Sequence, residues 1–142
     1  MAASPTAYAL DSLALLAYLE GEAGESRVRE LLEAAKAGSH TVHLSLINLG
    51  EALYITERER GLVAVHRTLA AMDQLPVQIE PVERATVLAA AHLKASHRIS
   101  YADAFAVVTA LEHQAVLITG DPDFRTLSES NLVNLEWLPR TR

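Results

Sequence analysis

Short runs of apolar residues alternate along the chain with longer stretches of helical periodicity. The short runs predict β-strands at residues 6–10, 41–44, 77–79, 116–119 and 133–138. Between them, helix-forming composition or apolar residues at helical spacing predict helices at 12–20, 25–37, 45–57, 62–74, 83–96 and 101–113. Strands that alternate with helices favour right-handed βαβ crossovers and a parallel sheet. We therefore predict an α/β fold of three layers, α/β/α, around a mostly parallel five-stranded sheet.

Length and composition describe one globular domain, which we expect to span residues 1–142. Apolar residues make up 50% of the chain and charged residues 21%, which is typical of a folded protein. The absence of cysteine excludes a disulfide scaffold, a thiol nucleophile and a thiolate metal site. Charges interrupt every apolar stretch before about 18 residues, so we expect no membrane-spanning helix. No basic residue precedes the first apolar run, so we expect no secretory signal and a cytoplasmic location.

The charge balance argues against a simple electrostatic binder of nucleic acid. Lys and Arg number 12 against 18 Asp and Glu, which gives a net charge of −6, whereas such a binder carries a basic face. An enzyme that binds cations first and nucleic acid afterwards is not excluded. Thirteen of the acids are Glu, mostly in helical runs, and only five are Asp. Because Asp is a poor helix former, each Asp calls for its own explanation.

Four acids fall at equivalent places in the predicted fold. Asp11 follows the first strand and Asp121 follows the fourth. Glu51 lies in the second turn of the helix that leaves the second strand, and Asp103 lies in the first turn of the helix that returns to the fourth. A helix in a βαβ unit runs antiparallel to its strands, so its first turns lie at the carboxyl edge of the sheet. All four carboxylates are therefore predicted at that edge, where open α/β sheets bind ligands.

Each acid also has a simpler explanation. Asp103 completes a capping-box pattern with Ser100, and Asp121 precedes a proline as an N-cap does. Asp11 could cap the helix that follows it, and Glu51 could be a solvated helix residue.

Taken together, the four acids favour a site. The segments around them are apolar, which places the carboxylates at the border of the core, where clustered negative charges repel one another. Arg125 is the one basic residue in these strand-end segments. A hard divalent cation, Mg²⁺ or Mn²⁺, would offset the repulsion and keep water ligands for catalysis.

Four motifs carry a resemblance to a known family: ALDS at 9–12, INLGEA at 47–52, ISYADA at 99–104 and ITGDPDF at 118–124. Each motif alone is weakly specific, but their order and spacing over essentially the whole chain resemble PIN-domain ribonucleases. They are most similar to the VapC-type toxins of type II toxin–antitoxin pairs. The resemblance implies a metal-dependent endoribonuclease, usually a homodimer, with a small antitoxin partner that lays a segment across the acidic groove.

The resemblance also implies the roles of individual residues. The family's acidic quartet, which would be catalytic and hold the metal, corresponds to Asp11, Glu51, Asp103 and Asp121. Asp123 corresponds to an accessory acid, and Ser12 and Thr119 correspond to the small hydroxyl residues beside the first and fourth acids. Leu13 departs from the pattern, because relatives often carry a β-branched residue there, and this affects packing alone.

The predicted chemistry is hydrolysis of an RNA phosphodiester by water activated on Mg²⁺ or Mn²⁺, with one or two ions. Glu51 would bind a metal through water or accept the proton of the attacking water. The hydroxyls of Ser12 and Thr119 would hydrogen-bond carboxylates or metal-bound water. The family resemblance implies products with 5′-phosphate and 3′-hydroxyl ends.

The substrate requires positive charge near the acids. Candidate RNA contacts are Arg125, Lys94 and Arg98, although each could equally be a solvated surface cation. Tyr54 and Tyr101 flank acidic motifs and could stack on a base, but we expect them to pack in the core.

Other residues are assigned no chemistry. We also place Trp137 and Leu138 in the core. The six histidines show neither HxH nor HxxxH spacing, and we interpret them as surface or packing residues.

Two other classes of function were weighed. A phosphotransfer site of the haloacid-dehalogenase type requires Asp-x-Asp-x-Thr after the first strand, and a response-regulator receiver requires a phosphorylatable Asp on the third; neither pattern is present. The stronger alternative is an inactive PIN-like scaffold that binds a protein partner through its acidic groove.

Overall fold

The computed structural model of the chain describes residues 5–139. Its single sheet has five strands in the order β3-β2-β1-β4-β5, and every neighbouring pair is parallel. The strands are β1 Thr6–Leu10, β2 His40–Ser45, β3 Gln78–Glu80, β4 Val116–Thr119 and β5 Leu135–Trp137. The predicted α/β class and parallel sheet are confirmed.

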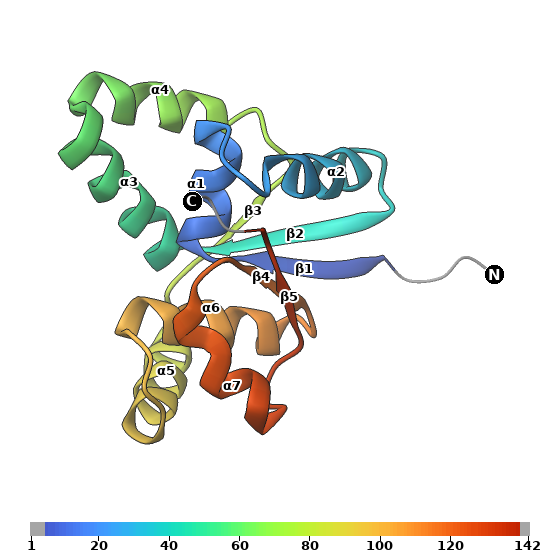
Figure 1. Cartoon of the computed structure of the whole chain (residues 1–142), viewed down its shortest axis with the longest axis vertical. Helices are drawn as coiled ribbons and strands as arrows, with labels where there is room; N and C mark the ends of the chain where they lie inside the picture. The colour runs from blue at the N-terminus through green and yellow to red at the C-terminus, as the bar shows by residue number, and fades with distance from the viewer. Residues whose placement is uncertain (1–4, 140–142) are drawn as a thin grey trace.

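Helices cover both faces of this sheet. The helices are α1 Ser12–Glu20, α2 Glu25–Lys36, α3 Leu46–Arg60, α4 Leu62–Met72, α5 Arg84–Ser96, α6 Tyr101–Glu112 and α7 Arg125–Ser130, with a 3₁₀ turn at Pro122–Phe124. Helices α1 to α4 lie on one side of the sheet and α5 to α7 on the other (Figure 1). The three predicted layers are therefore present.

Two hydrophobic cores flank the sheet, because successive residues of a strand point to opposite faces. Leu10 of β1 and Ile118 of β4 pack in the core under α1 and α2. Ala9 and Leu117, their chain neighbours, pack in the core with Phe105 of α6. Central parallel strands are apolar on both faces for this reason.

Helix α6 passes through the interior. All of residues 103–110 are buried, because the helix packs against both the sheet and α5. Its N-cap is Ser100, whose hydroxyl accepts a hydrogen bond from the Asp103 amide at 3.1 Å. The burial of residues 103–110 therefore carries the Asp103 carboxylate into the protein.

The end of the chain differs from the prediction. Strand β5 covers three residues instead of 133–138, and α7 was not predicted. Leu138 is buried as expected, but Trp137 is 43% exposed and its predicted place in the core is wrong. Trp137 is the last residue of the edge strand β5, which has a neighbouring strand on one side alone. No helix within residues 5–139 is long and apolar enough to span a membrane.

Candidate functional site

Asp11 lies at the carboxyl end of β1 and is 1% exposed. One carboxylate oxygen accepts a hydrogen bond from the Ala14 amide at 2.7 Å, so Asp11 is the N-cap of α1. The other oxygen accepts a hydrogen bond from the Thr119 hydroxyl at the end of β4. Asp11 thus caps a helix and also links two neighbouring strand ends.

The environment of Asp11 disfavours its negative charge. Burial raises the pKa of Asp11 to about 7, although the hydrogen bonds from Thr119 and Ala14 act in the opposite direction. The negative charges of Asp103 and Asp121 raise the pKa further. The carboxylates of Asp103 and Asp121 therefore lie close enough to Asp11 to repel its negative charge, although the three residues are far apart in the sequence.

Asp103 shows the same effect from the opposite side of the site. Burial raises the pKa of Asp103 to about 7, and the charge of Asp121 raises it too, while the hydrogen bond from Ser100 lowers it. Glu51 and Asp123 add smaller repulsions. The other acids singled out in the sequence therefore raise the pKa of Asp11, of Asp103 or of both in the folded chain.

Three of these acids form a tight group. Asp103, Asp121 and Asp123 each offer a carboxylate oxygen, and the three oxygens lie within 4.8 Å of one another. Asp121 caps the 3₁₀ turn by accepting a hydrogen bond from the Asp123 amide at 2.9 Å. The Asp121 amide donates to the Thr119 hydroxyl at 2.9 Å. Asp123, predicted as accessory, lies in this group, which we call the acidic cluster.

Glu51 reaches the site from α3 and is half-buried. Its Oε1 accepts a hydrogen bond from the Ser12 hydroxyl at the start of α1. The two hydroxyl residues therefore have parallel contacts: Ser12 holds Glu51, and Thr119 holds Asp11.

The donor set fits a hard divalent cation. In the described part of the chain, none of the five acids forms an ion pair with Lys or Arg. Closely spaced carboxylate oxygens without a basic partner are the ligands that Mg²⁺ and Mn²⁺ prefer. Burial and neighbouring carboxylates raise the pKa of Asp11 and Asp103, and a bound cation would favour their ionised forms.

Asn48 was not among the residues predicted to form the site. Its side chain is completely buried in α3, and its Nδ2 donates to the Ala102 carbonyl at the start of α6 at 3.0 Å. Asn48 therefore joins the helix that carries Glu51 to the helix that carries Asp103. Its Oδ1 is buried without a hydrogen-bond partner. The available signal was an amide side chain inside the otherwise apolar stretch 46–49.

The candidate RNA contacts differ in their surroundings. Arg125 and Arg98 are exposed. Lys94 donates from Nζ to the Ile99 carbonyl at 2.8 Å and so stabilises the connection between α5 and α6. Tyr54 and Tyr101 are 54% and 45% exposed, so their predicted place in the core is wrong. Both side chains project from exposed faces of their helices. The Tyr101 ring meets the Phe105 ring edge-on.

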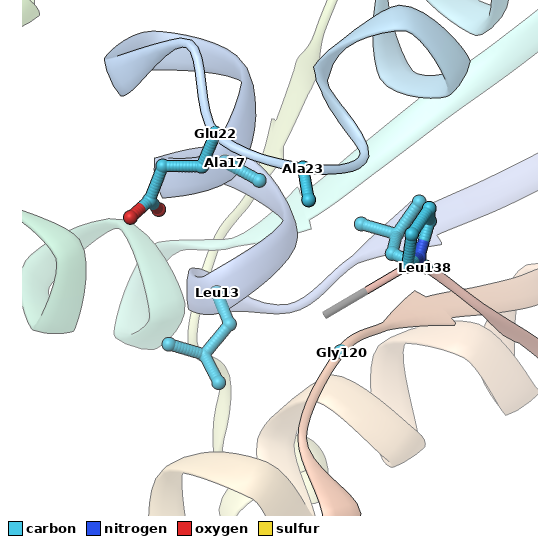
Figure 2. A pocket seen from close by; sticks show the side chains of 7 residues that line it. Leu13, Ala17, Glu22, Ala23, Gly120 and Leu138 are labelled. Carbon is cyan, nitrogen blue, oxygen red and sulfur yellow. The ribbon is translucent and has the colours of Figure 1, made fainter. Parts of the chain in front are cut away.

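A hollow of about 170 Å³ lies between α1 and the segments that follow β4 and β5 (Figure 2). Leu13 of α1, Gly120 after β4 and Leu138 after β5 surround it. Leu13 follows Ser12 and Gly120 precedes Asp121, so two of the lining residues are chain neighbours of site residues.

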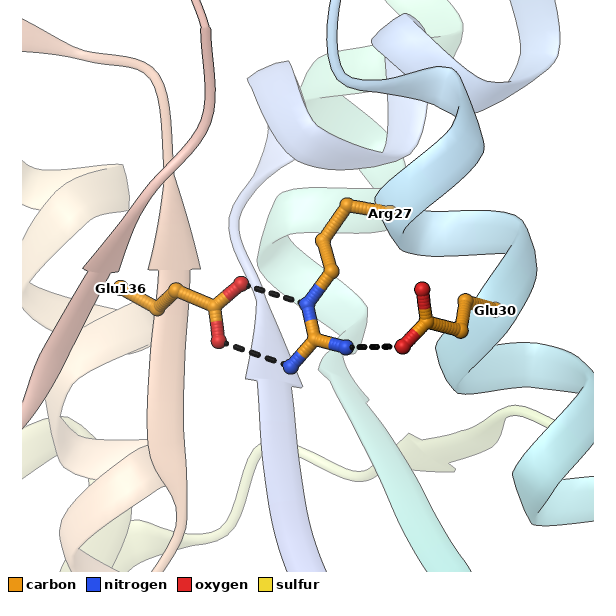
Figure 3. A network of polar contacts seen from close by, with 3 residues as sticks. All are labelled: Arg27, Glu30 and Glu136. Atoms are coloured by element: carbon orange, nitrogen blue, oxygen red, sulfur yellow. Dashed lines mark hydrogen bonds and ion pairs between the residues drawn. The ribbon is translucent and has the colours of Figure 1, made fainter.

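The strand next to this hollow is fixed by a charged network (Figure 3). Arg27 of α2 donates two hydrogen bonds to Glu136 of β5, at 2.7 Å and 3.0 Å, and a third to Glu30 at 2.8 Å. The bond to Glu136 raises the pKa of Arg27 above its usual value. The two hydrogen bonds from Arg27 to Glu136, which we call the Arg27 fork, link the short edge strand β5 to helix α2.

The fold and the site together define an α/β protein whose parallel sheet gathers carboxylates at its carboxyl edge. The sequence model of the PIN domain family matches residues 8–129. The chain therefore belongs to the PIN-domain family. No curated protein sequence matches the chain.

Solved structures of toxin–antitoxin proteins share the fold. VapBC2 from Rickettsia felis, bound to a DNA fragment from its promoter, has a TM-score of 0.72 at 18% identity and covers 94% of this chain and 100% of its own. DNA-bound VapBC from Salmonella typhimurium has a TM-score of 0.67 at 17% identity, with 92% and 97% covered. VapC20 from Mycobacterium tuberculosis, a toxin that cleaves the sarcin–ricin loop, has a TM-score of 0.64 at 22% identity, with 84% and 94% covered. These likenesses show the common fold.

Proposed function

We propose that this chain is a metal-dependent endoribonuclease and the toxin of a toxin–antitoxin pair. One observation carries the proposal: the buried carboxylates of Asp11 and Asp103 meet the half-buried Asp121 and the exposed Asp123 at the carboxyl edge of a PIN-domain sheet, without a basic partner among the described residues. Burial is the largest cause of the raised pKa of Asp11 and Asp103, whereas the carboxylates of an ordinary surface cluster stay hydrated.

Asp103, Asp121 and Asp123 would hold the cation, with Asp11 and Glu51 beside them. When bound, Mg²⁺ or Mn²⁺ lowers the pKa of a coordinated water and neutralises charge on the phosphate. Thr119 fixes the orientation of the Asp11 carboxylate, because its hydroxyl is bonded to the oxygen that Ala14 does not use.

Glu51 is the proposed proton acceptor. Ser12 holds Oε1, which leaves Oε2 to receive the proton of the attacking water. Asn48 is a positioning residue, because its hydrogen bond to the Ala102 carbonyl links α3, which carries Glu51, to α6, which carries Asp103. Arg125 and Arg98 would contact the RNA phosphates.

The partners are proposed on similar grounds. The solved structures with this fold include VapBC complexes, which supports a small antitoxin partner for this chain. The hollow lined by Leu13, Gly120 and Leu138 would offer that partner apolar contacts through its two leucines. The homodimer and the cytoplasmic location stay predictions from the sequence. We further propose that the PIN domain extends beyond the matched residues 8–129 through β5, which pairs with β4.

The direct test is cleavage of RNA by the purified protein with Mg²⁺ or Mn²⁺ and with EDTA. Asp103→Asn should lower cleavage at least about a hundredfold, the scale expected when a group that stabilises transition-state charge is lost. Asp73→Asn is the matched control, because Asp73 is an exposed aspartate at the end of α4.

Cleavage that persists in EDTA, or at the wild-type rate in Asp103→Asn, would contradict the proposal. A wild-type protein that never cleaves RNA but binds a partner through the acids would instead establish the inactive scaffold. No observation in the structure favours that alternative.

A further inference from the structure

A second cluster of metal-ligating side chains lies on the α6 face of β2 and β3. His43 belongs to β2, Glu80 ends β3, and His113 directly follows α6. One ligand atom from each lies within 4.8 Å of the others. His113 is ten residues beyond Asp103, which corresponds to about 15 Å along a helix axis, so this cluster is separate from the acidic one.

The carboxylate of Glu80 lies between the two imidazoles. Its Oε2 is 2.7 Å from Nδ1 of His43, and its Oε1 is 3.3 Å from Nε2 of His113. The two imidazole rings are stacked, with centroids 4.1 Å apart and planes inclined by 19°. Both rings therefore direct one nitrogen toward the same small volume.

The orientation of the His43 ring is fixed by a contact at the nitrogen that faces away from Glu80. His43 is 5% exposed, and its Nε2 lies 3.1 Å from the Thr41 hydroxyl on the same strand. This contact leaves Nδ1 for the cluster. Metal-binding histidines are generally held in this way, with the second ring nitrogen bonded to an outer group.

The charge and chemistry of the cluster select the kind of metal. Among the described residues, Glu80 forms ion pairs with these two histidines and with no Lys or Arg. Two imidazole nitrogens and a carboxylate suit Zn²⁺, which takes three such protein ligands and leaves a fourth position to water. Mg²⁺ prefers oxygen ligands alone and fits this cluster poorly.

We propose that His43, Glu80 and His113 form a zinc site distinct from the nuclease centre. The ion would replace the contacts between Glu80 and the imidazoles, with water as the fourth ligand and access through the partly exposed His113. It would tie β2, the three-residue edge strand β3 and the end of α6 together. Because β3 pairs with β2 alone, the cross-link would give this strand a second attachment to the rest of the protein.

The test is a titration of the purified full chain with Zn²⁺ and with Co²⁺ in excess Mg²⁺, which keeps oxygen-only sites filled. We expect one zinc ion per chain and, for cobalt, the intense visible absorption of a tetrahedral site. Zinc in hundredfold excess over its Kd should raise the Tm by roughly 5 °C or more.

His113→Ala should weaken zinc binding at least about tenfold, as loss of a ligand or its support does in other metal sites. His92→Ala is the matched control, because His92 is exposed on α5, and it should bind zinc as the wild type does. Asp103→Asn should also retain the tetrahedral cobalt spectrum, since it alters the acidic cluster alone.

Glu80→Gln provides a second variant if His113→Ala does not fold, and circular dichroism checks both. Weak octahedral cobalt absorption in the wild type, or unchanged zinc affinity in both cluster variants, would overturn the zinc site. Neither result bears on RNA cleavage, so the two proposals fail separately.

Discussion

Asp11 and Asp103 combine roles that the sequence presented as alternatives. Asp11 caps α1 through one oxygen while its other oxygen is held by Thr119. Asp103 lies within a capped first turn and still contributes an oxygen to the acidic cluster. A carboxylate has several acceptor positions, so capping a helix and facing a cation are compatible.

The raised pKa of Asp103 predicts an unusual dependence of stability on pH. The pKa is 3.8 in an unperturbed carboxyl and about 7 in the folded chain. Between these values the folded state binds more protons than the unfolded state. The free energy of unfolding of the metal-free protein should therefore fall as pH rises from about 4 to about 7 and stay low above that range.

Asp103→Asn should weaken this dependence and leave the part that arises from Asp11, whose pKa burial also raises to about 7. At pH 8 in EDTA the variant should exceed the wild type in free energy of unfolding, by on the order of 2 kcal/mol after allowance for partial hydration. At pH 4 the two proteins should be similar, as measured by urea unfolding. A variant that is less stable than the wild type at pH 8 would show that Asp103 is a structural residue.

At the scale of elements, the short strand β5 depends on contacts beyond its backbone pairing. It has three residues and one neighbouring strand, β4, which also carries Thr119 toward the site. The Arg27 fork supplies a link from β5 to α2, across the edge of the sheet.

A double-mutant cycle of Arg27→Gln and Glu136→Gln should give a coupling free energy of about 1 kcal/mol, because the fork is bidentate but about a third exposed. Thermal or urea unfolding measures it, and 1 M salt should reduce it. RNA cleavage should stay near the wild-type rate. Additive effects of the two substitutions would show that the fork contributes nothing to stability.

At the scale of the whole molecule, the acidic site links cation binding to folding. A cation that binds the folded chain alone stabilises it by mass action. Its carboxylate ligands must be ionised, so binding strengthens as pH rises through the pKa of about 7 of Asp11 and Asp103.

Mg²⁺ at millimolar concentration should therefore raise the Tm by a few degrees at pH 8 and by less at pH 5.5. Differential scanning fluorimetry of the wild type, Asp103→Asn and Asp73→Asn measures the effect. The rise should disappear in Asp103→Asn and persist in Asp73→Asn. An equal rise in all three proteins would indicate a nonspecific effect of salt.

Local sequence predicted most of the fold. Strands β1 and β4 were predicted with their observed bounds, because Asp11 and Gly120 end apolar runs that are buried on both faces. Helix α7 was missed because its sequence, RTLSES, buries only Leu127 and shows no apolar stripe. Strand β5 was predicted too long because alternation in the sequence continues beyond the residues that pair with β4.

The sequence by itself determined the order of the elements and the edge of the sheet at which the acids lie. The spacing of apolar residues identifies each strand and helix locally, and a helix between two parallel strands must run back antiparallel to them. The tertiary structure decided which side chains meet: Asp123 with Asp103, Asn48 with the start of α6, and Glu80 with two distant histidines. These contacts depend on strand register and on the packing of helices across the sheet. No spacing along the chain records such a contact, since each partner lies on a different element.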